Sequence, residues 1–132
     1  MIMQNRLVRS ASFAKNIALE DMAILTLDSD GMICHCNQSV CQLLNCTPNR
    51  VIWKKINMIL PQLENIKLMQ EESINPNLHF LSRIGHHFEV MALDGRRFNS
   101  LLYFKYVEDS GKHCLRLIIK PVDLDLVDER MQ

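Results

Sequence analysis

Four of the five cysteines lie close together in the sequence, at a spacing that could form a metal centre. Cys34, Cys36, Cys41 and Cys46 fall within thirteen residues, with His35 among them. On a strand, Cys34 and Cys36 would point to the same side, and Cys41 could approach from the next helix. Thiolates and imidazoles bind zinc, but structural zinc sites usually place Cys-x₂₋₄-Cys pairs on turns, and the one Cys-x-Cys here lies on a predicted strand. We therefore expect these cysteines to pack in the core, and Cys34 and Cys36 are only weak metal candidates.

The remaining side chains of chemical interest are scattered along the sequence. His79 lies near a predicted strand and is a third weak metal candidate, while His86 and His87 are expected at the solvated start of a strand. The sequence has no Gly-rich phosphate loop, nucleophile elbow or paired helical carboxylates. A Cys–His nucleophile would need Cys34 or Cys36 beside a base, yet both are expected to face inward. We expect no enzymatic activity.

The composition is that of a single globular domain. The chain has 132 residues, of which 48% are hydrophobic and 23% are charged, and 15 basic residues balance 15 acidic ones. A neutral chain has no field to hold a nucleic-acid backbone, so we expect no nucleic-acid partner. No segment reads as a signal peptide or membrane span, so we expect no membrane within this chain. An odd number of cysteines without a secretion signal is typical of reduced thiols in the cytoplasm.

The predicted elements define the fold class. Strands are predicted from short apolar runs bounded by turn residues: 22–27, 32–37, 87–93, 98–107 and 113–122. Helices are predicted from caps and helical spacing: an amphipathic helix over 5–20, then 38–44, Thr47 through Trp53, 56–60 and 62–74. We therefore predict an α+β fold, a five-stranded antiparallel sheet with several short helices packed on one face, preceded by an N-terminal amphipathic helix.

Local signals support several boundaries between these elements. The turn Asp28-Ser-Asp-Gly31 joins the first two strands, since Gly31 supplies positive φ and the Asp side chains bond nearby amides. Asn37 is the predicted N-cap of the helix over 38–44. Asn75-Pro-Asn77 is predicted to end the helix over 62–74.

In order and spacing, these motifs resemble the PAS sensory domain family over residues 21–125. The family opens with an apolar strand, an Asp-Gly turn, a second strand ending in Asn and a helix ending near a Leu-Leu pair, as Ile24 through Leu44 do here. The family's next two helices are matched by Val51-Ile52, Ile56 and Leu60-Pro61. Its hairpin between the third and fourth strands is matched by Asp94-Gly95 followed by Arg96-Arg97-Phe98. Its exit into a linker is matched by Val122-Asp123.

The resemblance implies three parts of the chain. Residues 1–20 would be a helical lead-in and dimerisation cap, 21–123 the sensor domain, and 124–132 the start of a linker. Such a linker leads in this family to an output domain such as a histidine kinase or diguanylate cyclase. The resemblance therefore implies a cytoplasmic sensor that binds a small ligand or partner and signals through a homodimer.

Several residues depart from the family pattern. Trp53 occupies a position where the family usually has Gly, and Asp123-Leu-Asp125 keeps only the first acid of the exit triplet. The light-sensing flavin subfamily has a reactive Cys where this sequence has Ile56-Asn-Met-Ile-Leu60. Haem-binding members take an axial His from the long helix, and 62–74 contains none. Neither flavin nor haem is therefore expected as a required cofactor, although a haem or metal redox sensor stays a weaker alternative.

The resemblance also assigns the positions that would face a ligand. They come from three strands and from the helical side: Met58, Met69, Phe88, Val90, Ser100, Leu102, Phe104, Leu115, Leu117 and Ile119. Such a pocket would be almost wholly apolar, with Ser100 as its one polar handle. The alternative is that these residues simply fill the core of a ligand-free protein–protein dimerisation module.

The opposite parity of the fourth strand places Leu101, Tyr103 and Val107 on the outer face of the sheet. Three large apolar residues there exceed what scattered surface hydrophobes account for. We therefore predict a symmetric homodimer that uses this face and the lead-in helix, through Leu7, Val8, Ala11, Leu101 and Tyr103.

Overall fold

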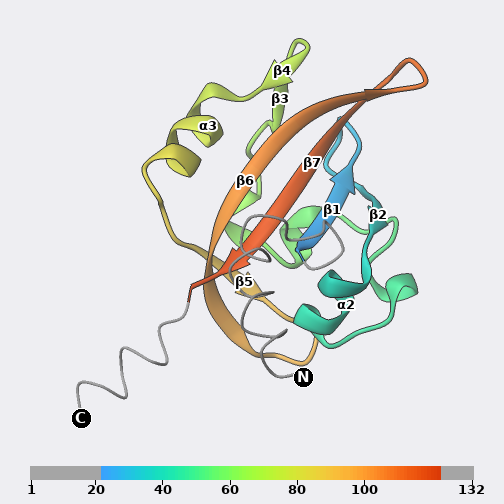
Figure 1. Ribbon diagram of the computed structural model, residues 1–132, viewed down its shortest axis with the longest axis vertical. Coiled ribbons are helices and arrows are strands. Elements are labelled where there is room, and N and C mark those ends of the chain that lie inside the picture. The colour runs from blue at the N-terminus through green and yellow to red at the C-terminus, as the bar shows by residue number, and fades with distance from the viewer. Residues whose placement is uncertain (1–21, 123–132) are drawn as a thin grey trace, which may run out of the picture.

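The computed structural model describes residues 22–122, which form a five-stranded antiparallel sheet with strand order β2-β1-β7-β6-β5 (Figure 1). The strands are β1 Ala23–Leu27, β2 Ile33–Cys36, β5 Phe88–Met91, β6 Arg97–Asp109 and β7 Lys112–Pro121. All five predicted strands are confirmed, and each lies at or near its predicted boundaries.

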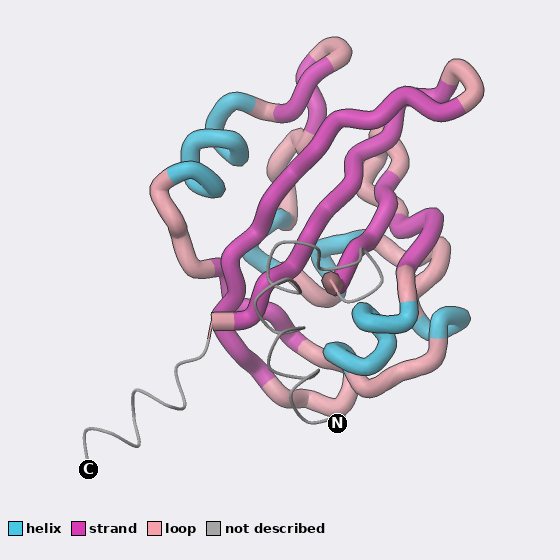
Figure 2. Tube along the Cα trace, viewed as in Figure 1, coloured by secondary structure: helices cyan, strands magenta, loops and turns pink. Residues whose placement is uncertain are grey.

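Short helices and one small hairpin fill the chain between β2 and β5 (Figure 2). They are the helices α2 Gln38–Leu44 and α3 Pro76–Arg83, the 3-10 turns η2 Pro48–Arg50, η3 Ile56–Met58 and η4 Pro61–Leu63, and the hairpin strands β3 Met69–Gln70 and β4 Ser73–Ile74. Helix α2 packs against β1, and α3 packs against β6. The predicted α+β fold is confirmed. The predicted helix over 5–20 and the parts 1–20 and 124–132 lie outside the described residues.

The first hairpin and the start of α2 form as their residues predict. The Oδ1 atom of Asp28 accepts hydrogen bonds from the N–H groups of Asp30 and Met32, both at 2.9 Å, and Gly31 has φ +85°. Asn37 is the N-cap of α2, because its Oδ1 accepts from the Val40 N–H at 3.2 Å. The Asn37 side chain also bonds both backbone groups that flank Ala23, the Ile24 N–H and the Met22 carbonyl. It therefore fixes α2 against β1.

The predicted long helix over 62–74 is wrong. This stretch contains η4 and the β3–β4 hairpin, and Asn65 and Glu71 adopt positive φ of 65° and 58°, which no helix tolerates. The helix is predicted from the spacing of Leu63, Ile66, Met69 and Ile74; three of these residues are buried without a helix, and Ile66 is 37% exposed. Asn75 and Pro76 begin a helix instead of ending one: Asn75 Oδ1 accepts from the Asn77 N–H at 2.9 Å, and Pro76 is the first residue of α3.

Trp53, at the position where the resemblance implies a glycine, has a left-handed backbone. Its φ is +68°, a left-handed value that is rare for a bulky residue, and its side chain is 64% exposed. The Trp53 N–H donates to the Ile33 carbonyl at 2.6 Å. The junction between η2 and β2 is therefore held by the backbone, and the indole points outward instead of being repacked into the core.

No helix within residues 22–122 is both long and apolar enough to span a membrane.

Candidate functional site

The inner face of the sheet gathers the predicted pocket positions of three strands into one surface. Alternate residues of β5, β6 and β7 point to this face, and all are buried: Phe88, Val90, Ser100, Leu102, Phe104, Leu115, Leu117 and Ile119. The register aligns them across the strands, with Phe88 opposite Ser100 and Leu102 opposite Ile119. The predicted parity of the three strands is therefore correct.

Ser100 is the one polar residue of this surface. Its side chain has no exposed area, and its hydroxyl has no hydrogen-bond partner among the described residues. Its cross-strand neighbours are Phe88 and Pro121. An unpartnered buried hydroxyl costs about 1–3 kcal/mol. The hydroxyl is therefore a polar group that the surrounding side chains leave unsatisfied.

The opposite wall comes from the segments between β2 and β5. Met69 is buried but lies on β3 instead of a helix, and Met58, at the end of η3, is half-buried. Four further buried residues of this wall lie outside the predicted ligand-facing set: Ile59, Leu60, Leu63 and Leu78. Ile59 and Leu60 stand as an apolar pair before Pro61, which could have indicated them. Leu78 was missed because Asn75-Pro-Asn77 was interpreted as the end of a helix.

The outer face of the sheet carries a groove of about 780 Å³ beside α2. Its lining includes Met22, Leu43, Tyr103, Ile118, Lys120 and Pro121. Tyr103 is 40% exposed, and Leu101 and Val107 are half-buried, so these three residues do lie on the outer face. Leu7, Val8 and Ala11 lie outside the described residues, and the homodimer stays a prediction.

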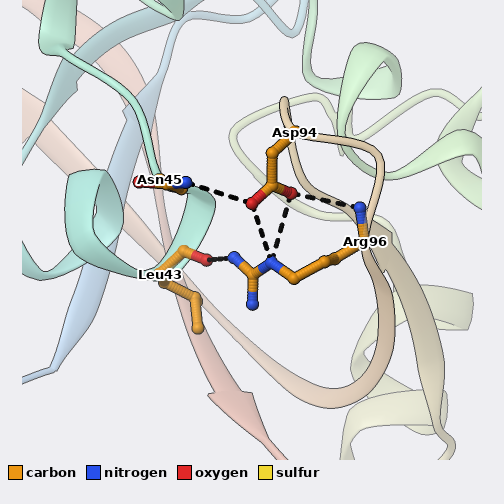
Figure 3. Close-up of polar contacts among 4 residues, drawn as sticks. All are labelled: Leu43, Asn45, Asp94 and Arg96. Atoms are coloured by element: carbon orange, nitrogen blue, oxygen red, sulfur yellow. Dashed lines mark hydrogen bonds and ion pairs between the residues drawn. The ribbon is translucent and has the colours of Figure 1, made fainter.

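A polar cluster joins the end of α2 to the turn between β5 and β6 (Figure 3). The Asp94 carboxylate accepts from the Arg96 N–H and guanidinium and from the Asn45 side chain, and Arg96 also donates to the Leu43 carbonyl at 2.9 Å. The backbone N–H of Arg96, its guanidinium and the Asn45 amide lower the pKa of Asp94 to about 2. This cluster ties the C-terminal end of α2 to the Asp94-Gly95 turn.

The cysteines separate into two groups and do not form one metal centre. A β-bulge at Cys34 breaks the alternation of β2, so Cys34 and Cys36 have different neighbours and do not share one environment as expected. Cys34 lies near Asp28, Cys114 and Lys112, whereas the Cys36 thiol contacts that of Cys41. Within residues 22–122, no group of three or more Cys, His, Asp or Glu side chains could hold a metal ion.

The helix that precedes β5 in the structure, α3, contains one histidine, whereas the predicted helix over 62–74 contains none. Because α3 replaces the expected helix over 62–74, His79 lies within it. Its side chain is exposed, whereas Leu78 is the residue of α3 that enters the core. His79 therefore does not face the inner surface, where an axial haem ligand would be needed.

The fold is that of known PAS domains. No family model matches the sequence, and no curated protein matches it. Solved structures similar to this chain include the PAS domain of an HTR-like protein from Haloarcula marismortui, with a TM-score of 0.60 and 17% identity over 91% of this chain and 98% of that chain. The PAS domain of a two-component sensor histidine kinase has a TM-score of 0.59 and 11% identity, covering 90% and 99% of the two chains.

A light-sensing domain is similar as well. The LOV domain of the blue-light photoreceptor Aureochrome1 has a TM-score of 0.55 and 14% identity, covering 91% of this chain and 98% of that one. These likenesses define an α+β fold class, and this chain has the PAS domain fold. At such identities the likeness establishes the fold alone.

Proposed function

We propose that this chain is a sensory signal-transduction module, without catalytic activity of its own, that binds a small and largely apolar ligand against the inner face of its sheet. The observation that carries the proposal is the Ser100 hydroxyl, fully buried and without a partner among the described residues. A ligand with one polar atom would satisfy this hydroxyl, while its apolar part would contact the aromatic and aliphatic side chains around it.

The wall opposite the sheet suits such a ligand. Met58 and Met69 flank the core from segments without long helices, and methionine side chains adapt to fill irregular space. Entry of a ligand would therefore displace flexible side chains rather than a packed helix. Ligand binding would shift the equilibrium between two packings of the wall against the sheet.

The outer face of the sheet would transmit this shift. We propose a homodimer through Leu101, Tyr103 and the lead-in residues Leu7, Val8 and Ala11, with an output domain such as a histidine kinase receiving the signal. Support for the output comes from the fold, which occurs in a domain of a two-component sensor histidine kinase. Support for the dimer comes from the exposed apolar surface around Tyr103.

The ligand is tested by comparing the protein as purified with protein unfolded in denaturant, freed of small molecules and refolded. A ligand at roughly 100 times its Kd stabilises the folded state by about 2.7 kcal/mol, so the refolded protein should melt at a lower temperature. Ser100→Ala should show a smaller difference between its two preparations. An absorbance spectrum of the purified protein tests the haem and flavin alternatives in the same sample.

The second candidate function is a ligand-free dimerisation module. The observation that favours it is that the chain's own segments bury all eight sheet residues predicted to face a ligand, from Phe88 on β5 to Ile119 on β7. In that case the two preparations melt at the same temperature and the purified protein carries no small molecule. The dimer is tested independently by sedimentation of the wild type, so the ligand and the dimer proposals fail separately.

A further inference from the structure

Helix α2 brings together three thiols that are spaced five residues apart. Cys36 ends β2, Cys41 lies within α2, and Cys46 follows the helix. The junction is fixed by Asn37, whose side chain bonds the Val40 N–H inside α2 and the Ile24 N–H on β1. The thiols of Cys36 and Cys41 are therefore held against each other by the fold itself.

Cys41 is the middle one of the three thiols. Its Sγ lies 3.9 Å from that of Cys36, and, in addition to burial, it is close enough to Cys46 to raise the pKa of that thiol. The chain turns at Asn45, which has φ +55°, and the Cys46 N–H then donates to the Cys41 carbonyl at 3.0 Å. Cys41 is thus the shared member of two thiol pairs.

The environment of these thiols disfavours metal binding. Cys36 is 8% exposed, and burial together with the neighbouring Cys41 raises its pKa to about 12. Burial also raises the pKa of Cys46. Metal ligation and attack on a peroxide both require a thiolate, so the half-buried Cys41, and not the buried Cys36, is the thiol assigned to the first oxidation step. Two contacting thiols can instead lose two electrons together and form a disulfide.

We propose that the three thiols form an oxidation site in which Cys41 becomes linked to Cys36 or to Cys46 by a disulfide when the protein meets a peroxide. In the first step, Cys41 loses its thiol proton and its sulfur attacks the O–O bond of hydrogen peroxide; the hydroxide that leaves takes up that proton, which gives a sulfenic acid on Cys41 and one water. In the second, the sulfur of the neighbouring thiol displaces the hydroxyl of the sulfenic acid as a second water. Two thiols and one peroxide thus give one disulfide and two waters.

The site would act on the outer face of the sheet and does not depend on a ligand at Ser100. A disulfide brings two sulfur atoms to about 2 Å, which is shorter than the 3.9 Å between Cys36 and Cys41. Closing that gap moves α2 against β2. Because Ser39, Gln42 and Leu43 of α2 line the outer groove, oxidation would change the shape of the groove.

The test is oxidation of the full chain with hydrogen peroxide, followed by intact mass measurement, counting of free thiols and peptide mapping. Each wild-type chain has five free cysteines and should lose two of them, with a mass decrease of two hydrogens. Cys41→Ser should prevent this loss. Cys36→Ser and Cys46→Ser should each still form one disulfide, and Cys34→Ser is the matched control that should behave like the wild type.

A second variant keeps the proposal falsifiable if Cys41→Ser does not fold. The double variant Cys36→Ser/Cys46→Ser retains Cys41 without either neighbour, and it should form no intramolecular disulfide. Circular dichroism of each variant before oxidation establishes that it is folded. An intramolecular disulfide in a folded variant that lacks Cys41, or a wild type whose only disulfide joins Cys34 to Cys114, would overturn the proposal.

Discussion

On its inner face the five-stranded sheet presents side chains that are almost all buried, whereas its outer face presents half-buried and exposed ones. Along β7, Leu115, Leu117 and Ile119 are inaccessible, while the alternating Arg116 and Ile118 are half-buried. Along β6, Leu102 and Phe104 are buried, while Tyr103 is 40% exposed. The inner face is thus closed by the chain's own segments, and among the described residues the outer face is only partly covered. One face suits a ligand site and the other suits a protein partner.

The largest expected effect is the difference in lost stability between alanine substitutions at two neighbouring residues of β7. Leu117→Ala removes a fully buried side chain and should lower the free energy of unfolding by about 3 kcal/mol, within a usual range of about 2–5 kcal/mol. Ile118→Ala on the outer face should cost about 1 kcal/mol, because its side chain is only half-buried. Urea denaturation of both variants measures the difference. Equal losses would mean that the outer face is as tightly covered as the inner one.

The next effect concerns association through the outer face. Tyr103→Ser should raise the dissociation constant of the homodimer by roughly tenfold or more, equivalent to about 1.4 kcal/mol, since large aromatic residues dominate such interfaces. Lys105→Ser is the matched control, because Lys105 is an exposed residue on the same face of the same strand. Sedimentation of the wild type and both variants measures the dissociation constant. A monomeric wild type at tens of micromolar concentration would contradict the dimer.

A smaller effect is the difference in stability between alanine substitutions at two serines, Ser82 on α3 and Ser100 on β6. Ser82 donates its hydroxyl proton to the Leu102 carbonyl at 2.6 Å, so Ser82→Ala should destabilise the protein by about 1 kcal/mol. In protein refolded without ligand, Ser100→Ala should be neutral or stabilising by up to about 1 kcal/mol, because it removes an unsatisfied buried hydroxyl. Chemical denaturation measures both. A loss of stability in Ser100→Ala would show that its hydroxyl already has a partner.

The smallest effect concerns Asp94, which ties α2 to the β5–β6 turn. Its folded-state pKa of about 2 lies below the usual value of 3.8, so the ionised carboxylate stabilises the folded protein above about pH 4. This contribution is lost as the pH falls through about 2. Asp94→Asn should therefore flatten the dependence of unfolding free energy on pH in this window, and Arg96→Gln should flatten it in part. An unchanged slope in Asp94→Asn would contradict the assignment.

Local chemistry made much of the fold predictable. The Asp28–Gly31 turn, the Asn37 cap and the alternation of β6 and β7 each depend on interactions within a few residues or across one pair of strands. The same alternation located Ser100 and the rest of the sheet's inner surface. These features follow from turn geometry, capping and the two-residue period of a strand.

The remainder depends on contacts that spacing alone does not show. Leu63, Met69 and Ile74 have helical spacing, yet left-handed residues at Asn65 and Glu71 fold that stretch into a turn and a hairpin. The bulge at Cys34 comes from pairing with β1 and separates the two thiols of the Cys-x-Cys motif. Trp53 was identified as standing in a glycine position, but only the structure shows that it keeps the left-handed backbone. In each case tertiary contacts override a local pattern.

Native mass spectrometry of the wild type and Ser100→Ala, purified side by side, tests whether a ligand is held against Ser100. We expect the folded wild type to carry a non-covalent small molecule, which is released on unfolding and is reduced or lost in Ser100→Ala. A wild type that shows only the mass of its own chain, or an equal amount of bound molecule in both proteins, would contradict it.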